Sequence, residues 1–276
     1  KTNNELHSAF GYFAKLGMYK EDLINKNFYS LTPKFLLRYS PGQMRNVENG
    51  RLNYGNLFNI NKVNELDIVE PGLSTSVGFE YKKNKLDESN LTSDEVISFA
   101  VGQVISEKEN MNVPSRTSLD QRFSDVVGES KYNINDKIHL NYNFSIDQGY
   151  KTFNYNEVGA DFAFEQAKFN LSYLNEKNHV GNQEFVQTGV DFLINKSSEF
   201  SVNTKRNLLT NSAEFYNLSY NYINDCLKAG IAYRREFYTD RDVEPTNTLM
   251  FTNDSGVDQT LASIGKSVAL AIVFGV

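Results

Sequence analysis

Residues 137–147 read Lys-Ile-His-Leu-Asn-Tyr-Asn-Phe-Ser-Ile-Asp, and this stretch decides the fold. Apolar side chains occupy the even positions from 138 to 146, and polar side chains occupy the odd positions. A helix that started at Ile138 would need apolar residues at 141, 142 and 145, and only Tyr142 fits. The stretch therefore predicts a β-strand with one apolar face and one polar face.

The same alternation recurs along the chain, with Leu36 as an apolar interruption of an otherwise polar face. Further alternating segments are residues 34–40, 76–82, 169–173, 216–222 and 227–234. Turn-forming residues stand between such segments, at Pro41–Gly42, Glu48–Gly50, Asp147–Gly149 and Asn195–Ser198. Glycines fall inside the predicted strands, where bends and bulges of a curved sheet are their usual cause; they are Gly17, Gly78, Gly102, Gly159, Gly189 and Gly230.

The pattern predicts an all-β fold, an antiparallel transmembrane β-barrel of which this chain forms a part. We expect roughly 14 strands of about 9–12 residues, long enough to cross a bilayer when tilted. A soluble β-sandwich also alternates, but it has fewer and shorter strands and an apolar core between two sheets. In the barrel, Ile138, Leu140, Tyr142 and Phe144 should face outward, toward lipid. Residues 84–93 and 107–119 are predicted to be longer polar loops on the extracellular side.

Composition excludes several classes of protein. The chain carries 28 Lys+Arg against 34 Asp+Glu, for a net charge of -6, which argues against nucleic acid as a partner. No apolar run is long enough for a transmembrane helix, and barrel strands do not need one. The chain begins at Lys1 without a signal peptide, so we expect a piece whose N-terminal part is absent.

No catalytic, metal or cofactor site is predicted. His7, His139 and His179 have no ligand-like spacing. His139 lies on a polar strand face and could serve a Ser-His pair, but a residue lining the lumen is the better interpretation. Asp240–Asp242 is read as an ion-paired loop rather than a cation site. The cluster Lys82, Lys83 and Lys85 could contact phosphates, although a solvated strand end is the simpler interpretation.

Three stretches resemble the LPS-assembly outer-membrane family LptD (OstA), of the alphaproteobacterial type. Residues 31–46 resemble a family strand that runs into a "Y-S/A-P" turn. Residues 214–242 resemble a strand that ends near "N-D-C", followed by a strand leading into a "D-R-D" loop. Ser124–Gly128 resembles a third segment, and weak similarity covers most of residues 5–252. Residues 253–276 depart from the family pattern, so residues 1–276 are expected to be the C-terminal part of the barrel domain with an atypical end.

The resemblance implies an outer-membrane translocon of a Gram-negative bacterium that assembles lipopolysaccharide into the outer leaflet without covalent chemistry. It implies lipopolysaccharide, membrane lipids, the lipoprotein plug LptE where present, and the periplasmic Lpt bridge as partners. It also implies a disulfide from Cys226 to the missing N-terminal region. The alternatives are a generic porin-like channel and, less favoured, a barrel phospholipase, which would need a Ser-His pair backed by an orienting group.

Overall fold

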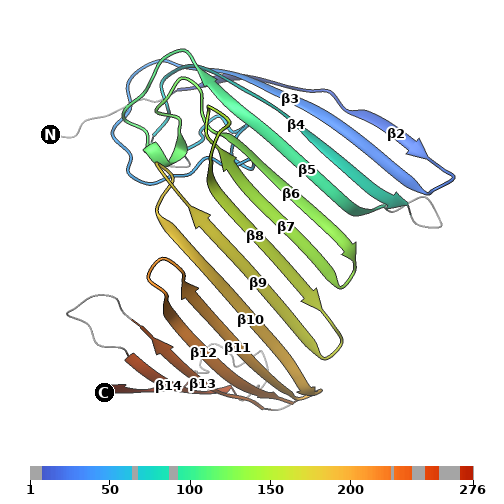
Figure 1. Cartoon of the computed structure of the whole chain (residues 1–276), viewed down its shortest axis with the longest axis vertical. Coiled ribbons are helices and arrows are strands. Elements are labelled where there is room, and N and C mark those ends of the chain that lie inside the picture. The colour runs from blue at the N-terminus through green and yellow to red at the C-terminus, as the bar shows by residue number, and fades with distance from the viewer. Residues whose placement is uncertain are drawn as a thin grey trace, which may run out of the picture. The chain divides into compact units, whose positions relative to one another are not determined.

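The computed structural model describes residues 8–63, 68–86, 93–224, 227–237, 246–254 and 268–275. These residues are all-β apart from one short 3-10 helix, η1 (Ser115–Thr117), and their fifteen strands belong to one antiparallel sheet (Figure 1). Within the described residues, no helix has the length and apolar character needed to cross a membrane. The strands are β1 (Phe10–Lys15), β2 (Met18–Asp22), β3 (Asn27–Ser40), β4 (Gly72–Leu86), β5 (Ser93–Ser106), β6 (Val126–Asn135), β7 (Ile138–Ile146), β8 (Phe153–Ala163), β9 (Ala167–Glu176), β10 (Gln183–Asn195), β11 (Ser198–Asn207), β12 (Ser212–Ile223), β13 (Lys228–Glu236), β14 (Thr246–Asp254) and β15 (Val268–Gly275).

The strands follow one another in the sheet in chain order, as a meander, except at its first position. There β1 and β2 both pair with β3, so the fifteen strands fill fourteen positions (15 − 1), which confirms the predicted number. The break between β1 and β2 lies opposite Pro33 of β3, which accepts a hydrogen bond from Leu16 (3.1 Å). Because proline has no N–H to return, pairing is interrupted there, and Gly17 lies between two strands rather than inside one.

The last strand pairs in the same way as the others. Although residues 253–276 depart from the family pattern, β15 pairs antiparallel with β14, from Asn253 opposite Val268 to Thr246 opposite Gly275. The apolar run at the end of the chain therefore takes the fourteenth position of the sheet.

The two loops predicted for one side of the membrane lie at opposite ends of the strands. In an antiparallel meander, successive connections alternate between the two ends, so the β4–β5 and β5–β6 connections cannot share a side. The first is also shorter than predicted, because β4 continues to Leu86 and β5 begins at Ser93. The predicted loop at 107–119 does exist and extends to residue 125. A still longer connection, residues 41–71 between β3 and β4, was not predicted.

The chain forms two compact units. The first contains residues 1–135, 139–158 and 174–183, and the second contains residues 136–138, 159–173 and 184–276. The long connections 41–71 and 107–125 belong to the first unit and lie at the same end of β3, β4, β5 and β6 (Figure 1).

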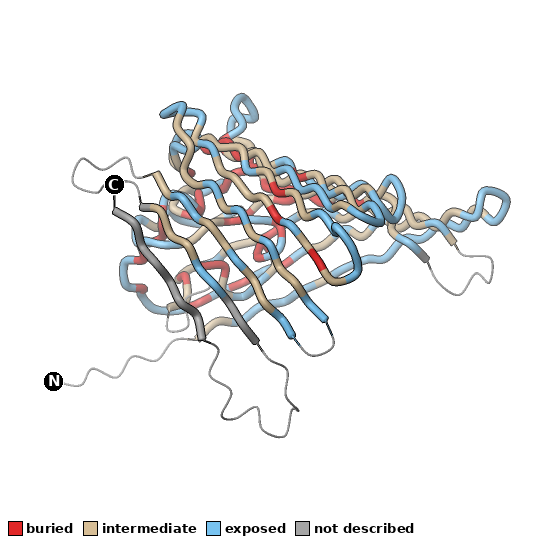
Figure 2. Tube along the Cα trace, turned by 90° about the horizontal axis from the view of Figure 1, so that it is seen from below, coloured by how far each residue is buried: buried red, intermediate tan, exposed pale blue. Residues whose placement is uncertain are grey.

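In the first unit, β3 shows the two faces of the sheet most clearly. Phe35, Leu37 and Tyr39 are exposed on one face, which we call the outer face. Leu36 and Arg38 point to the opposite, inner face and are only 2% and 1% exposed. Figure 2 shows buried positions interspersed with exposed ones along the strands. Leu36 interrupts the polar pattern because part of the chain covers it.

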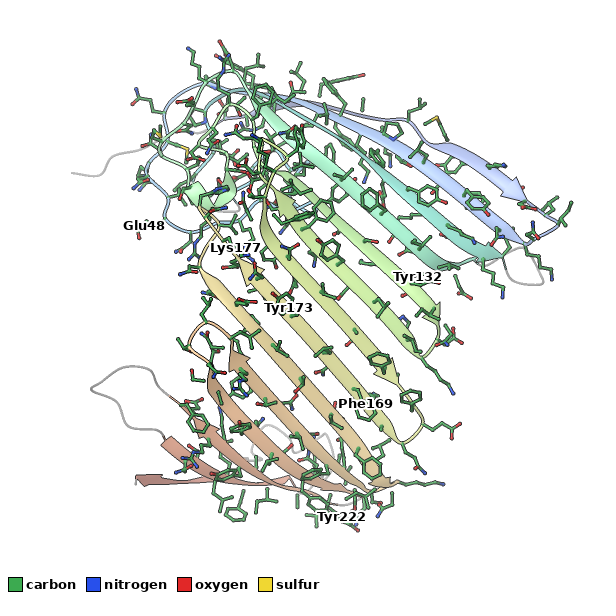
Figure 3. The ribbon with its side chains drawn as sticks, viewed as in Figure 1. Glu48, Tyr132, Phe169, Tyr173, Lys177 and Tyr222 are labelled. Atoms are coloured by element: carbon green, nitrogen blue, oxygen red, sulfur yellow. The ribbon has the colours of Figure 1, made fainter. Side chains whose placement is uncertain are left out.

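In the second unit, β12 keeps the simple alternation. On β12, Tyr216, Leu218 and Tyr220 are exposed, while Ser219 between them is half-buried. Side chains line both faces of the strands in this unit (Figure 3). The hydroxyl of Tyr173 on β9 donates to the carboxylate of Glu184 on β10 (2.7 Å).

The expectation for Phe144 needs a correction. All described strands lie in one sheet, so no second sheet covers the apolar face of β7. Phe144 is nevertheless 8% exposed, because its ring lies over Gly128 and has aromatic neighbours on the same face. Its ring centroid is 5.5 Å from that of Tyr142 and 6.4 Å from those of Phe99 and Phe153. Phe144 is thus buried by aromatic neighbours on the same face of the sheet and not by a second sheet.

Candidate functional site

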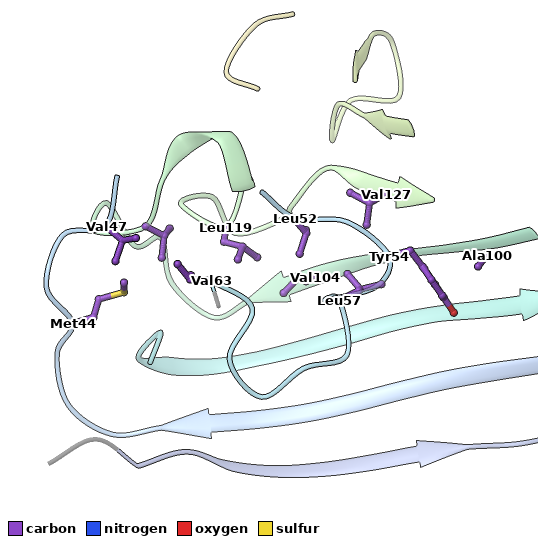
Figure 4. Close-up of a cluster of buried hydrophobic side chains, with 11 residues drawn as sticks. Met44, Val47, Leu52, Tyr54, Leu57, Val63, Ala100, Val104, Leu119 and Val127 are labelled. Atoms are coloured by element: carbon purple, nitrogen blue, oxygen red, sulfur yellow. The ribbon is translucent and has the colours of Figure 1, made fainter. Parts of the chain in front are cut away.

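The candidate site is the inner face of the first unit, where residues 41–71 and 107–125 cover strands β5 and β6. Their buried apolar side chains form one cluster with those of the strands (Figure 4). We call residues 41–71 the covering segment. The cluster contains Met44, Val47, Leu52, Tyr54, Leu57, Val63, Ala100, Val104, Val113, Leu119 and Val127.

A turn stabilised by two asparagines directs the covering segment onto the sheet. The backbone N–H of Asn53 donates to the side-chain oxygen of Asn56 (2.9 Å), and the backbone N–H of Asn56 donates to the side-chain oxygen of Asn53 (3.0 Å). Asparagine commonly stabilises turns in this way. The turn presents Leu57, which is fully buried, to the strands below.

Two glycines make room for this turn. Gly78 of β4 and Gly102 of β5 are paired across the strands. A Cβ on Gly78 would lie 3.2 Å from the ring of Phe58, and one on Gly102 would collide with Leu57. A Cβ at Gly78 or Gly102 would also lie 2.5 Å or 2.6 Å from a backbone carbonyl oxygen of the paired strand, so these glycines permit close approach both of the two strands and of the covering segment.

Arg38 fastens the covering segment to β3. Its guanidinium donates to the backbone carbonyls of Ile60 and Glu70, and its Nη2 lies 3.2 Å from Glu70 Oε2. Glu70 Oε1 accepts the backbone N–H groups of Lys62 (2.8 Å) and Val63 (2.9 Å). Burial lowers the pKa of Lys62 to about 8, and the nearby Glu70 carboxylate offsets only part of this cost.

Asp125 joins four parts of the chain. Its Oδ2 accepts hydrogen bonds from Ser145 of β7 (2.8 Å) and Asn154 of β8 (2.9 Å), and it lies 2.9 Å from His179 Nε2 in the β9–β10 connection. Burial alone would raise the pKa of Asp125, but these hydrogen bonds outweigh burial and lower it. The hydrogen bond to Asp125 in turn raises the pKa of His179. The arrangement fixes residues 107–125 against the sheet.

A small cavity lined by both charged and apolar residues lies beside this cluster. It has a volume of about 280 Å³ and includes Arg51, Glu129, Tyr155 and Glu157 in its lining. The Arg51 guanidinium lies 4.5 Å from the centre of the Tyr155 ring and pairs with Glu176, the last residue of β9. The cavity offers charges of both signs beside aromatic and aliphatic surface, which suits an amphipathic ligand.

The two histidines that the structure describes have different partners. His139 Nδ1 bonds to the Asn133 side chain (2.8 Å), and His179 bonds to Asp125. The Asp125 carboxylate stands between His179 and the Ser145 hydroxyl, so both bond to the acid, an order unlike that of a catalytic triad. His7, Cys226 and residues 240–242 lie outside the described residues. Among the described residues, no group of three or more side chains could hold a metal ion.

The predicted lysine cluster is only partly free. Lys82 Nζ lies 2.7 Å from Glu80 and 3.7 Å from Glu95, while Lys83 Nζ lies 5.9 Å from the centre of the Tyr29 ring. The residues that build the inner-face site, such as Arg38, Arg51 and Asp125, were not singled out from the sequence. The interruption at Leu36 and the paired glycines were the available signals.

Comparison with known proteins gives the family. The family model described as "LptD: LPS transport system D" matches residues 22–212, which include the whole covering segment but not the resemblance at 214–242. No curated protein matches the chain. Two mutants of the Rhodopseudomonas blastica porin are similar at 9% identity. One covers 98% of this chain and 95% of its own with a TM-score of 0.40, and the other covers 97% and 98% with a TM-score of 0.34. Since the family model matches well over half of its residues, the chain belongs to the LPS transport system D (LptD) family.

Proposed function

We propose that this chain is part of an outer-membrane β-barrel through which lipopolysaccharide reaches the outer leaflet of a Gram-negative bacterium. The observation that carries the proposal is the family match across residues 22–212. The faces of the sheet support it, because exposed aromatic and aliphatic residues suit contact with acyl chains and polar residues suit the sugar portion. No covalent step is needed, and the chain acts by binding and passage.

The finer parts of the proposal rest on the resemblance. They are an alphaproteobacterial type, a position at the C-terminal end of the barrel domain, an atypical end at residues 253–276, the plug LptE, and a periplasmic Lpt bridge. Cys226 is proposed to form a disulfide to the N-terminal region. It lies in the β12–β13 connection, which falls at the same end of the strands as the two-residue β10–β11 turn. Short turns of such barrels face the periplasm, where disulfides form.

A porin-like channel is the alternative from another class. A porin would pass small solutes and would not need to contact lipopolysaccharide inside the barrel. A barrel phospholipase would need a hydroxyl hydrogen-bonded to a histidine, whereas Asp125 separates Ser145 from His179.

Site-specific photo-crosslinking in cells tests the proposal. A benzophenone amino acid replaces Tyr155, which lines the inner cavity, or Tyr39, which is exposed on the outer face. We expect lipopolysaccharide adducts at residue 155 that disappear when lipopolysaccharide supply is blocked. Adducts at residue 39 report lipid around the barrel and should persist. A protein that inserts and supports growth, yet gives no supply-dependent adduct at residue 155, would contradict the proposal and favour a passive channel.

The disulfide has a separate test. In full-length protein from cells, a thiol reagent should label Cys226 only after reduction. Equally strong labelling without reductant would show a free thiol and would leave the transport proposal untouched.

A further inference from the structure

Lys62 is a buried cation that has no partner of its own among the described residues. The residue is 2% exposed, and it lies in the covering segment next to Arg38 and Glu70. Among the residues that the structure describes, no group engages Lys62 Nζ in a hydrogen bond or ion pair. Buried charges in proteins are normally paired, so an unpaired ammonium needs a physical reason.

The neighbouring Glu70 carboxylate already pairs with Arg38, although its buried Oε2 accepts no hydrogen bond from the described residues. Glu70 Oε1 accepts two backbone N–H groups, and Oε2 lies 3.2 Å from the Arg38 guanidinium. The guanidinium in turn donates to two backbone carbonyls. The group of Arg38, Lys62 and Glu70 therefore holds two cations against one carboxylate, and one positive charge remains at Lys62.

Lys62 lines a cavity that could admit a ligand. The cavity has a volume of about 430 Å³ and lies between the start and end of the covering segment and the beginning of residues 107–125. Ser74 and Ser106 contribute hydroxyl groups to its wall. Glu107, Lys108 and Glu109 line it as well, but they are exposed, so water and salt weaken their effect.

We propose that this cavity is an oxyanion site, in which Lys62 binds a phosphate group. Phosphate supplies the negative charge that the buried cluster lacks, and it can accept hydrogen bonds from the ammonium and the serine hydroxyls. The inference stands on the geometry of Lys62 and does not depend on the proposed transport function. The phosphate could be free in solution or carried by a lipid headgroup.

Calorimetric titration of the detergent-solubilised full chain with sodium phosphate, at constant ionic strength and near neutral pH, tests the site. Lys62→Met should weaken binding by about thirtyfold or more, the usual effect of removing one partner of a buried charge pair. Lys62→Arg should keep much of the binding, and Lys108→Met is the matched control at the exposed rim. Lys62→Met removes an unpaired buried charge, so it should fold at least as stably as the wild type.

The source of the phosphate is resolved by competition. Micelles containing phosphatidic acid are compared with micelles containing diacylglycerol. Displacement of phosphate by the phosphatidic acid micelles alone assigns the site to a lipid headgroup, and no displacement assigns it to free phosphate. Absence of saturable phosphate binding, or equal binding by Lys62→Met, overturns the proposal.

Discussion

At Gly102 the lack of a side chain decides whether the covering segment can reach the sheet. Leu57 is fully buried above this glycine and its partner Gly78. Gly11 of β1 also lies under the segment, but a Cβ there would meet Leu36 and Ile60 at 3.4–3.7 Å, which is ordinary contact. A side chain should therefore be tolerated at Gly11 but not at Gly102.

Gly102→Ala should destabilise the protein by about 1–3 kcal/mol, the range for overpacked sites. The added methyl group collides with Leu57 and would lie 2.6 Å from the Val77 carbonyl oxygen. Gly11→Ala should be neutral or slightly stabilising, because alanine restricts the unfolded chain. Denaturant unfolding of the two variants in the same detergent measures the difference. Equal stability would show that the segment does not rest on Gly102.

The hydrogen bond between His179 and Asp125 makes the attachment of residues 107–125 depend on pH. The raised pKa of His179 gives stability that is fully present below its unfolded value of 6.5 and is lost as pH rises through the folded pKa. The lowered pKa of Asp125 gives stability present above its unfolded value of 3.8 and lost as pH falls through the folded pKa.

Hydrogen exchange of residues 118–125, corrected for the intrinsic rate, should therefore be slowest between these two values. Protection should decrease as pH rises above the folded pKa of His179. His179→Gln should flatten this alkaline limb, while an acid limb should remain but weaken, because Asn154 and Ser145 still bond to Asp125 but the contribution of His179 to its lowered pKa is lost. An unchanged alkaline limb in the variant would show that another group titrates.

At the scale of elements, the covering segment is held on the sheet by its own set of side-chain contacts. Arg38 ties its later half to β3, and Arg51 ties its middle to Glu176 at the end of β9. Leu57 and its neighbours supply the apolar contact. Arg38 is the strongest of these attachments because it contacts the backbone at two places.

Arg38→Leu should release the covering segment and cost about 3–5 kcal/mol, since Glu70 would lose its ion-pair partner and two buried backbone carbonyls would lose their donor. Hydrogen exchange of residues 60–63 and 68–70 should rise. Arg234→Gln removes the exposed pair with Glu236 and is the control, with an expected cost of about 0–1 kcal/mol. If both variants behaved alike, Arg38 would not fasten the segment.

The strands could be predicted from the sequence, but the covering segment could not. Strict alternation identifies β7 and β12 because each has one consistently apolar face. Residues 41–71 have no such period, and Pro41–Gly42 suggested a short turn. The segment is held by contacts between distant residues, such as Arg38 with Glu70 and Arg51 with Glu176, and local patterns do not carry these pairings.

At the scale of the whole molecule, the contrast between the two faces of the sheet should govern insertion. On β12, Leu218 is exposed on the apolar face and Ser219 lies on the other. A membrane barrel turns its apolar face to the lipid and its polar face to the lumen, so these adjacent residues should meet opposite surroundings.

Leu218→Arg should destabilise the membrane-inserted protein by about 2–4 kcal/mol if the residue lies near the bilayer midplane. Ser219→Arg, the adjacent control, should cost far less because polar residues are accepted inside such barrels. Reversible unfolding from lipid vesicles measures both. Equal costs would contradict the assignment of the two faces.

The pairing of Ser40 with Gly72 gives the covering segment an evolutionary property. Its two ends leave the sheet at facing positions of neighbouring strands, so a short hairpin turn could join β3 to β4 directly. The segment is in this sense a cassette, which can be lengthened, shortened or exchanged without changing the strand order. Relatives that lack it should carry a polar residue in place of Leu36, whereas Gly78 and Gly102 should stay glycine, because a Cβ at either would also meet the backbone of the neighbouring strand.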